Sequence, residues 1–174
     1  FDRIGNKKIH FISLCGMDHS DFKKPGTYSY EELFSVARRL RLSRDEAIEI
    51  FRRMVFNVIA RNQDDHSKNI GFLLNKDDGK WRLAPAFDMV YSYRKDSPWV
   101  NSHQMTINGK RDNISREDLH IVATSCISNF SRKDTNSIIN HVIDVVANWD
   151  HYAKESRVFP ELHRKIKSHI RIRI

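Results

Sequence analysis

Residues 62–72 read NQDDHSKNIGF, and this stretch decides how the rest of the chain is interpreted. It crowds two aspartates, a histidine, a lysine and two asparagines between a long apolar helical pattern and a second apolar run. Polar groups at a buried junction are costly unless they are hydrogen-bonded or hold a ligand. The segment is therefore either a set of turn and cap residues or a chemical site.

Two helical patterns lead into this segment. Residues 29–40 and residues 43–60 each open with a serine that is followed three positions later by a glutamate, the spacing of a capping box. The second pattern has apolar residues at a 3.6-residue period and predicts the best-defined helix of the chain. Because the connection between the two patterns is short, we expect the helices to pack as a hairpin.

A β-hairpin is predicted directly after the polar segment. Residues 70–74 and 81–85 have the composition of short strands, and Asp78-Gly79 between them is a strong turn signal. Pro85 ends the second strand, because proline has no N–H for a central ladder. Residues 86–111 are aromatic and poorly periodic, which indicates a loop with short strands.

The remaining sequence is helical in pattern. One helix is expected from Ser115, a long one over residues 134–155, and a last one from near Pro160. The long helix should face inward with Ile138, Ile139, Val142, Val146 and Trp149. Residues 163–174 fit either an edge strand or a frayed helix end, with nucleic-acid contact as a weaker alternative. The prediction is a single mainly α domain with a small β-hairpin.

Bulk composition limits the function classes. With 174 residues, 40% of them hydrophobic and 30% charged, the chain suits one folded domain and not a disordered one. No stretch approaches the roughly 18 apolar residues of a membrane helix, and no signal peptide is visible, so we expect a cytoplasmic protein without a membrane partner. Cys15 and Cys126 are expected to be reduced thiols. The formal net charge of +8 suggests an anionic partner such as a nucleotide, nucleic acid or acidic protein surface.

The spacing of Asp64 and Asn69 suggests a reaction. They are five residues apart, as are the base and the metal-binding asparagine of the protein-kinase catalytic loop. Asp88 follows the predicted hairpin, whose far end returns near its start, so the three side chains can converge. The spacing alone is common by chance. The spacing becomes a specific signal because a predicted hairpin and then a Phe87-Asp88 pair follow it in the chain.

These residues carry a family resemblance. NQDDHSKNIGF, followed by LAPAFDMV at residues 83–90, resembles the catalytic segment of the HipA-type serine/threonine kinases, the toxins of bacterial toxin–antitoxin pairs. The opening FDR resembles the end of that family's hinge segment. SYEEL and MTINGKRDNISREDL resemble its C-terminal lobe. The resemblance covers nearly the whole chain, with most of its specificity between Asn62 and Val90.

The resemblance implies that three residues form the catalytic site. It also implies that ATP and Mg²⁺ are the cofactors. Asp64 would be the catalytic base, and Asn69 and Asp88 would hold Mg²⁺. The fold implied is the helical C-terminal lobe of a two-lobed, protein-kinase-like enzyme.

The resemblance also implies how ATP is bound. His66 and the backbone of Ser67 and Lys68 would lie along the phosphates, with Phe87 positioning Asp88 and Phe1 at the hinge beside the adenine. Because the chain begins at the hinge without Met, we expect a fragment that lacks the N-terminal lobe and is inactive alone. No glycine-rich phosphate-binding motif occurs in the sequence.

The partners implied are a protein substrate, with an aminoacyl-tRNA synthetase as the family's example, and a HipB-like DNA-binding antitoxin. DNA would be reached only through that antitoxin. Two other function classes stay open. The first is a non-enzymatic binding module that docks an antitoxin or nucleic acid. The second is a metal-dependent phosphohydrolase that uses Asp64, Asp65 and His66.

Several residues have a structural interpretation beside the functional one. Asn62 and Asp65 are as well explained by fixing the loop as by touching a ligand. Lys68 is equally compatible with a solvated surface position. His66 lacks the further spaced histidines of a zinc site. Three tryptophans are better explained as core or subunit-contact residues than as nucleotide stackers, namely Trp81, Trp99 and Trp149.

Overall fold

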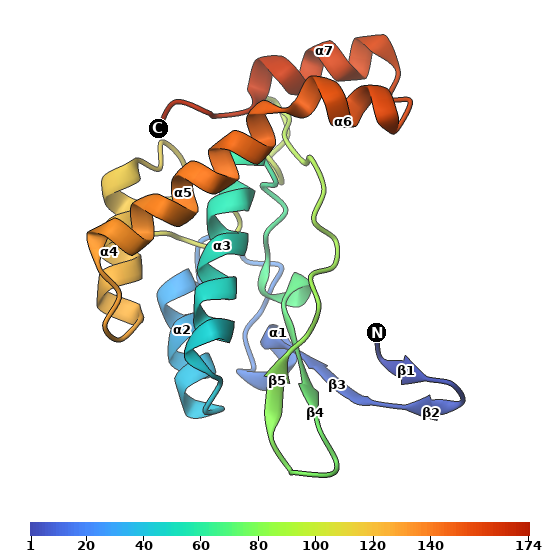
Figure 1. The fold of residues 1–174 in the computed structure, drawn as a ribbon, viewed down its shortest axis with the longest axis vertical. Helices are drawn as coiled ribbons and strands as arrows, with labels where there is room; N and C mark the ends of the chain where they lie inside the picture. The colour runs from blue at the N-terminus through green and yellow to red at the C-terminus, as the bar shows by residue number, and fades with distance from the viewer.

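A computed structural model describes the backbone of residues 1–174 and every side chain except that of Ile4. Helices α2 to α5 pack beside a three-stranded antiparallel sheet, and α6 and α7 form a helical pair at one end of the molecule (Figure 1). The fold is mainly α with a small sheet, as predicted. None of the described helices is long and apolar enough to cross a membrane.

The predicted hairpin is present as β4 (Gly71–Leu74) and β5 (Trp81–Leu83). Its loop closes with the N–H of Asn75 donating to the carbonyl of Lys80 at 2.9 Å, and Gly79 has a φ of +65° that suits glycine. β5 ends before Pro85, as expected.

The sheet has a third strand that the sequence pattern did not predict. β3 (His10–Ser13) pairs with β4, giving the order β3-β4-β5, and β1 (Arg3–Ile4) and β2 (Lys7–Lys8) form a separate antiparallel pair. A Cβ on Gly71 would lie 2.2 Å from the Phe11 ring, so only glycine lets this ring pack across β4. The pairing of β3 joins segments about sixty residues apart and leaves no local signal.

The helices begin where the serines predict. α2 (Tyr30–Arg39) and α3 (Arg44–Ala60) open with complete capping boxes at Ser29 and Ser43. Further capping boxes precede α4 (Arg116–Cys126) and α5 (Arg132–Ala147). α1 (Leu14–Met17) is a single turn after β3.

The predictions of one long helix over residues 134–155 and of short strands within residues 86–111 are wrong. The long helix over residues 134–155 is instead α5, which ends at Ala147, and α6 (Trp149–Glu155). The Trp149 indole donates to the carbonyl of His163 at 3.1 Å, so α6 turns away to pack on α7 (Pro160–His169). Residues 86–111 contain isolated bridges and no strand.

The C-terminal segment is neither an edge strand nor a frayed helix end. α7 is regular as far as His169, and the chain then continues in extended form. The N–H of Arg171 donates to the carbonyl of Ile59 at 2.8 Å, and Ile170 and Ile174 pack against the core. The segment therefore belongs to the folded body.

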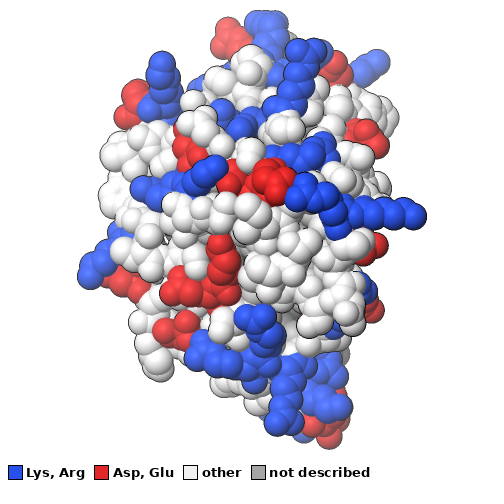
Figure 2. Space-filling model, turned by 90° about the vertical axis from the view of Figure 1, so that its left-hand side faces the viewer, with Lys and Arg blue, Asp and Glu red and all other residues white. Residues whose placement is uncertain are grey.

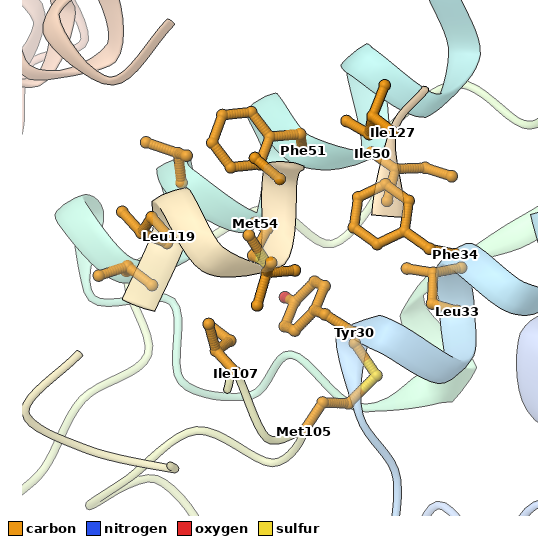
Figure 3. Packing of buried hydrophobic residues seen from close by; sticks show 14 of the residues in the cluster. Tyr30, Leu33, Phe34, Ile50, Phe51, Met54, Met105, Ile107, Leu119 and Ile127 are labelled. Atoms are coloured by element: carbon orange, nitrogen blue, oxygen red, sulfur yellow. The ribbon is translucent and has the colours of Figure 1, made fainter. Parts of the chain in front are cut away.

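The main core lies between α2, α3, α4 and α5 (Figure 3). Met105 and Ile107 from the irregular segment 86–111 are buried in it although that segment has no periodic pattern. The inward face of α5 is confirmed at Ile139, Val142 and Val146, whereas Ile138 and Trp149 are only partly buried. The large side chains that fill this core include Tyr30, Leu33, Phe34, Ile50, Phe51, Met54, Leu119 and Ile127.

Candidate functional site

The polar segment begins where α3 ends. Arg61 takes the left-handed conformation with a φ of 59°, which stops the helix and turns the chain into the loop. The N–H of Gln63 donates to the carbonyl of Ser92 at 3.0 Å, and the N–H of Ser92 donates to the carbonyl of Arg61 at 2.9 Å. The segment after the hairpin is thus held against the start of the loop.

The C-terminal segment also contacts this place. Arg61 Nε donates to the carbonyl of His169 at 3.1 Å, and the Arg61 guanidinium lies 4.3 Å from the centre of the Tyr93 ring. The Tyr91 hydroxyl lies 2.6 Å from His169 Nδ1. We call these contacts, together with the Arg171–Ile59 backbone bond, the C-terminal clasp. It joins three distant stretches of sequence at the base of the polar loop.

Asp64 and Asp65 differ sharply in burial. The Asp64 side chain is 44% exposed, whereas that of Asp65 is 1% exposed. Asp65 accepts hydrogen bonds from Tyr30, His103 and the backbone of Gln104. Asp65 therefore fixes the loop, and Asp64 remains accessible at the surface.

Asn62 likewise has a structural place. It is buried, and its Nδ2 donates to Asn57 Oδ1 on α3 at 2.9 Å. Its own Oδ1 is buried without a hydrogen-bond partner among the described residues.

Asn69 closes the loop at its other end. It ends the short 3₁₀ turn Ser67–Asn69, and its Nδ2 donates to the backbone carbonyl of Asp64 at 3.0 Å. Within the part of the chain that the structure describes, no group donates to the Asn69 side-chain oxygen. The amide is therefore oriented by its nitrogen and keeps its oxygen for a ligand.

Asp88 returns to the loop by way of the hairpin. It takes a left-handed φ of 56°, a conformation that aspartate and asparagine tolerate better than most residues. His66, Asn69, Phe87 and Asp88 line one pocket between the loop, α3 and the segment after β5. The predicted convergence is thus present for Asn69 and Asp88. Asp64 lies outside this lining and is tied to it through its hydrogen bond with Asn69.

The histidine and lysine of the loop pack on a residue that the sequence did not single out. The Phe22 ring centre lies 5.4 Å from that of His66 and 4.9 Å from Lys68 Nζ. His66 Nε2 lies 3.8 Å from Asp64 Oδ1, and His66 Nδ1 is buried with no partner in the described chain. Phe22 stands outside any periodic pattern, so nothing in the sequence pointed to it.

Ser67 does not present its side chain to the pocket. It is buried, and its hydroxyl lies 3.1 Å from the hydroxyl of Ser20. Any contact that Ser67 makes with a phosphate must therefore come from its backbone, which is the contact that the sequence predicted.

Three phenylalanines meet at the edge of the site. The Phe1 ring centre lies 5.5 Å from that of Phe87 and 5.6 Å from that of Phe11, and Phe11 and Phe87 are 5.9 Å apart. Phe87 is therefore held from two sides beside Asp88. Phe1 is half exposed, with one face available to a ligand or another part of a protein.

The residues present fit a hard cation better than a transition metal. Magnesium prefers a few protein oxygens completed by water and phosphate, and Asn69 and Asp88 offer an amide oxygen and a carboxylate to one pocket. The described residues contain no group of three or more His, Cys, Asp or Glu side chains placed to hold a metal. Asp65 lines the same pocket as His66, but its side chain is 1% exposed and both of its oxygens accept hydrogen bonds from the protein. It therefore does not fit the Asp64, Asp65 and His66 metal site of a phosphohydrolase.

The face of the molecule that presents α2, α4 and α5 carries charges of both signs (Figure 2). Basic and acidic side chains are interspersed over this face from top to bottom. On this face the net charge of +8 is not concentrated into a continuous basic surface of the kind that nucleic-acid binding favours.

A helical body with a small antiparallel sheet, whose polar loop shares a pocket with the segment after the hairpin, is the arrangement of a kinase-like C-terminal lobe. Residues 1–149 match the family model of the HipA-like C-terminal domain, and the chain belongs to that family. The resemblance seen in the sequence is confirmed.

A solved structure has the same fold. It is described as the Shewanella oneidensis MR-1 toxin–antitoxin system HipA, HipB and its operator DNA complex, and it aligns with a TM-score of 0.71 at 20% sequence identity. The alignment covers 97% of this chain and 44% of that chain, so the present chain spans less than half the length of its structural relative. No curated protein sequence matches the chain.

Proposed function

We propose that this chain is the C-terminal catalytic lobe of a HipA-like serine/threonine kinase toxin, which transfers the γ-phosphate of ATP to a protein hydroxyl. The observation that supports this most directly is the loop geometry. An exposed Asp64 is tied to Asn69, and Asn69 shares a pocket with Asp88. Family membership makes this arrangement more than a chance spacing.

In this proposal each residue has one task. Asp64 accepts the proton of the attacking hydroxyl. The Asn69 side-chain oxygen and the Asp88 carboxylate hold Mg²⁺. When bound, ATP would supply the phosphoryl group, and Mg²⁺ would neutralise its negative charge.

The residues around this centre orient the nucleotide. His66 and the backbone of Ser67 and Lys68 lie along the phosphates. Phe87 keeps Asp88 in place by packing between Phe1 and Phe11, and Phe1 lies at the adenine end.

Activity is expected only in a longer protein. Phosphoryl transfer depends on closing the nucleotide between positioned groups, and this single lobe has no glycine-rich phosphate-binding motif in its sequence. The structural relative is more than twice as long as the part that this chain matches. We therefore propose that the isolated 174 residues are inactive.

The partners are proposed by analogy with that relative, whose structure contains HipB and operator DNA. A HipB-like antitoxin would bind this protein in the cytoplasm, and DNA would be reached only through the antitoxin. The substrate would be a protein, with an aminoacyl-tRNA synthetase as the first to try. Nothing in the described pocket selects among protein substrates.

A non-enzymatic binding module is the second candidate, because the net charge of +8 favours an anionic partner. The kinase and the binding module differ in their response to salt and to Mg-ATP. A binding module would lose nucleic-acid affinity steeply with salt and would not respond to Mg-ATP.

The deciding experiment uses the complete reading frame and its Asp64→Asn variant. Each protein is incubated with Mg-ATP and an aminoacyl-tRNA synthetase, and the intact mass of every component is measured. Phosphate added by the wild type and not by the variant supports the kinase. If neither protein adds phosphate to itself or to the synthetase, weight moves to the binding module.

A further inference from the structure

Asp65, the residue next to the proposed base, has a carboxylate that is fully engaged inside the protein. The Tyr30 hydroxyl donates to its Oδ2 at 2.9 Å, and His103 Nδ1 lies 2.8 Å from the same oxygen. The N–H of Gln104 donates to Oδ1 at 2.8 Å. Both oxygens are thus held by donors from two segments far from the loop in sequence. The side chains of Asp65 and His103 are almost completely buried.

The hydrogen bonds continue from Asp65 back to the beginning of the loop. Asn57 Nδ2 on α3 donates to the Tyr30 hydroxyl at 2.9 Å, and Asn62 Nδ2 donates to Asn57 Oδ1 at 2.9 Å. Asn62, Asn57, Tyr30 and Asp65 therefore form a continuous buried chain, which we call the loop anchor. It attaches the loop at two points to the helices of the core.

The protonation of Tyr30 suits this arrangement. Burial, together with the negative charge of Asp65, raises the pKa of Tyr30 well above its ordinary value. The hydroxyl thus stays a donor to the carboxylate at any ordinary pH. A buried carboxylate with three donors is stable, whereas the same group without them would be costly.

We propose that Asp65 is the positioning residue of this site, because the loop anchor forces Asp65 inward and thereby turns Asp64 outward. The effect of Asp65 on the reaction rate rests on the proposed function. Its effect on the orientation of the loop rests on the geometry alone. Of these two adjacent carboxylates one is buried and the other exposed, so releasing Asp65 lets Asp64 rotate out of place. Misplacing a catalytic group by about 1 Å can cost about 10²-fold in rate.

A first test needs no activity and uses the 174-residue chain. Asp65→Asn keeps the shape of the side chain but removes its charge and one acceptor. We expect amide hydrogen exchange in residues 64–69 to become about 10-fold faster or more, with exchange in α5 unchanged, because the loop opens locally while the core stays folded. Unchanged exchange in the loop would overturn the proposal.

The matched control is Asp118→Asn. Asp118 is also a buried carboxylate with several donors, among them Asn108 Nδ2 at 2.8 Å and the Ser115 hydroxyl at 2.6 Å. It lies at the start of α4, outside the loop anchor. This variant should lower the melting temperature without speeding exchange in residues 64–69. Should Asp65→Asn fail to fold, Tyr30→Phe removes the hydroxyl that donates to Asp65 and accepts from Asn57, while the bonds from His103 and Gln104 to Asp65 remain. It should speed exchange in the loop to a smaller degree.

A second test measures the catalytic part in the complete reading frame. Asp65→Asn should lower kcat about 10- to 100-fold while the KM for ATP changes by less than about 2-fold. In an Asp64→Asn background the same substitution should cost nothing more, because Asp65 acts through Asp64. The positioning role would be refuted if the kcat loss of the double variant were the product of the two single losses. It would also be refuted if Asp65→Asn had the same kcat as Asp118→Asn. A wild type without phosphoryl transfer would refute the proposed function instead, and hydrogen exchange would still decide the structural part.

Discussion

The side-chain amide of Asn69 donates to the backbone carbonyl of Asp64 across 3.0 Å, so the two ends of the proposed catalytic loop are joined directly. This bond gives Asn69 two separate tasks. Its nitrogen shapes the loop, and in the proposed kinase its oxygen would face Mg²⁺.

Substitution of Asn69 can separate these tasks. Asn69→Asp keeps an oxygen ligand but cannot donate to Asp64, whereas Asn69→Ala loses both functions. In the complete protein we expect Mg-ATP binding to survive in the aspartate variant and to fall in the alanine variant, with kcat reduced in both. Calorimetric titration with Mg-ATP and steady-state kinetics would measure the two effects. Equal nucleotide affinity in both variants would argue against Asn69 as a metal ligand.

Asp64 and Asp88 should fail in different ways. Asp64→Asn should lower kcat by about 10²- to 10⁴-fold, the range for loss of a positioned general base, and should leave ATP affinity nearly intact. Asp88→Asn should instead raise the Mg²⁺ concentration needed for the half-maximal rate. Asparagine is chosen because Asp88 has a left-handed φ of 56°, in which alanine would be strained. Near-normal turnover in both variants would contradict the catalytic assignment.

Gly71 in β4 is expected to resist replacement. In Gly71→Ala the new Cβ would lie 2.2 Å from the Phe11 ring, which is itself packed against Phe1 and Phe87. Overpacking of this kind costs about 1–3 kcal/mol of unfolding free energy. Urea unfolding would measure the loss, and adding Phe11→Leu should recover part of it. An unchanged unfolding midpoint in Gly71→Ala would show that the ring moves freely.

Two histidines, His120 in the interior and the partly buried His169, should make the stability depend on pH. Burial, with Arg132 nearby, lowers the pKa of His120 below 6.5, and burial beside Arg61 lowers that of His169. The unfolded chain therefore binds more protons than the folded one below about pH 6.5, and the free energy of unfolding falls as the pH drops from 7 towards 5. Urea unfolding at several pH values should show this decline, with a shallower slope in His120→Gln. A slope that is the same in wild type and variant would exclude His120 as its source.

Local signals in the sequence account for much of this fold. The capping boxes at Ser29 and Ser43 and the turn at Asp78-Gly79 depend on residues a few positions apart, and all three are present as predicted. By contrast, β3 pairs with a strand far along the chain. The break at Asn148 follows from the packing of Trp149 on α7. Neither contact leaves a local pattern.

The residues of the site also fall into those that local spacing predicts and those that only the fold brings together. The five-residue spacing identified Asp64 and Asn69, and the hairpin brought Asp88 to the pocket of Asn69. The partners of Asp65 could not be found in this way, because Tyr30 and His103 come from separate parts of the chain and meet only in the folded core. The catalytic roles of Asp64, Asn69 and Asp88 are predictions from the sequence.

The C-terminal clasp has a consequence for the order of events during synthesis. Arg61 is bonded to His169, a residue 108 positions further along. At a ribosomal speed of about 5–20 residues per second, the loop emerges at least several seconds before the segment that clasps its base. Nascent or prematurely terminated chains therefore carry the complete motif without the clasp. In the kinase proposed above, unfinished copies would thus have the catalytic residues before the contacts that hold the base of their loop.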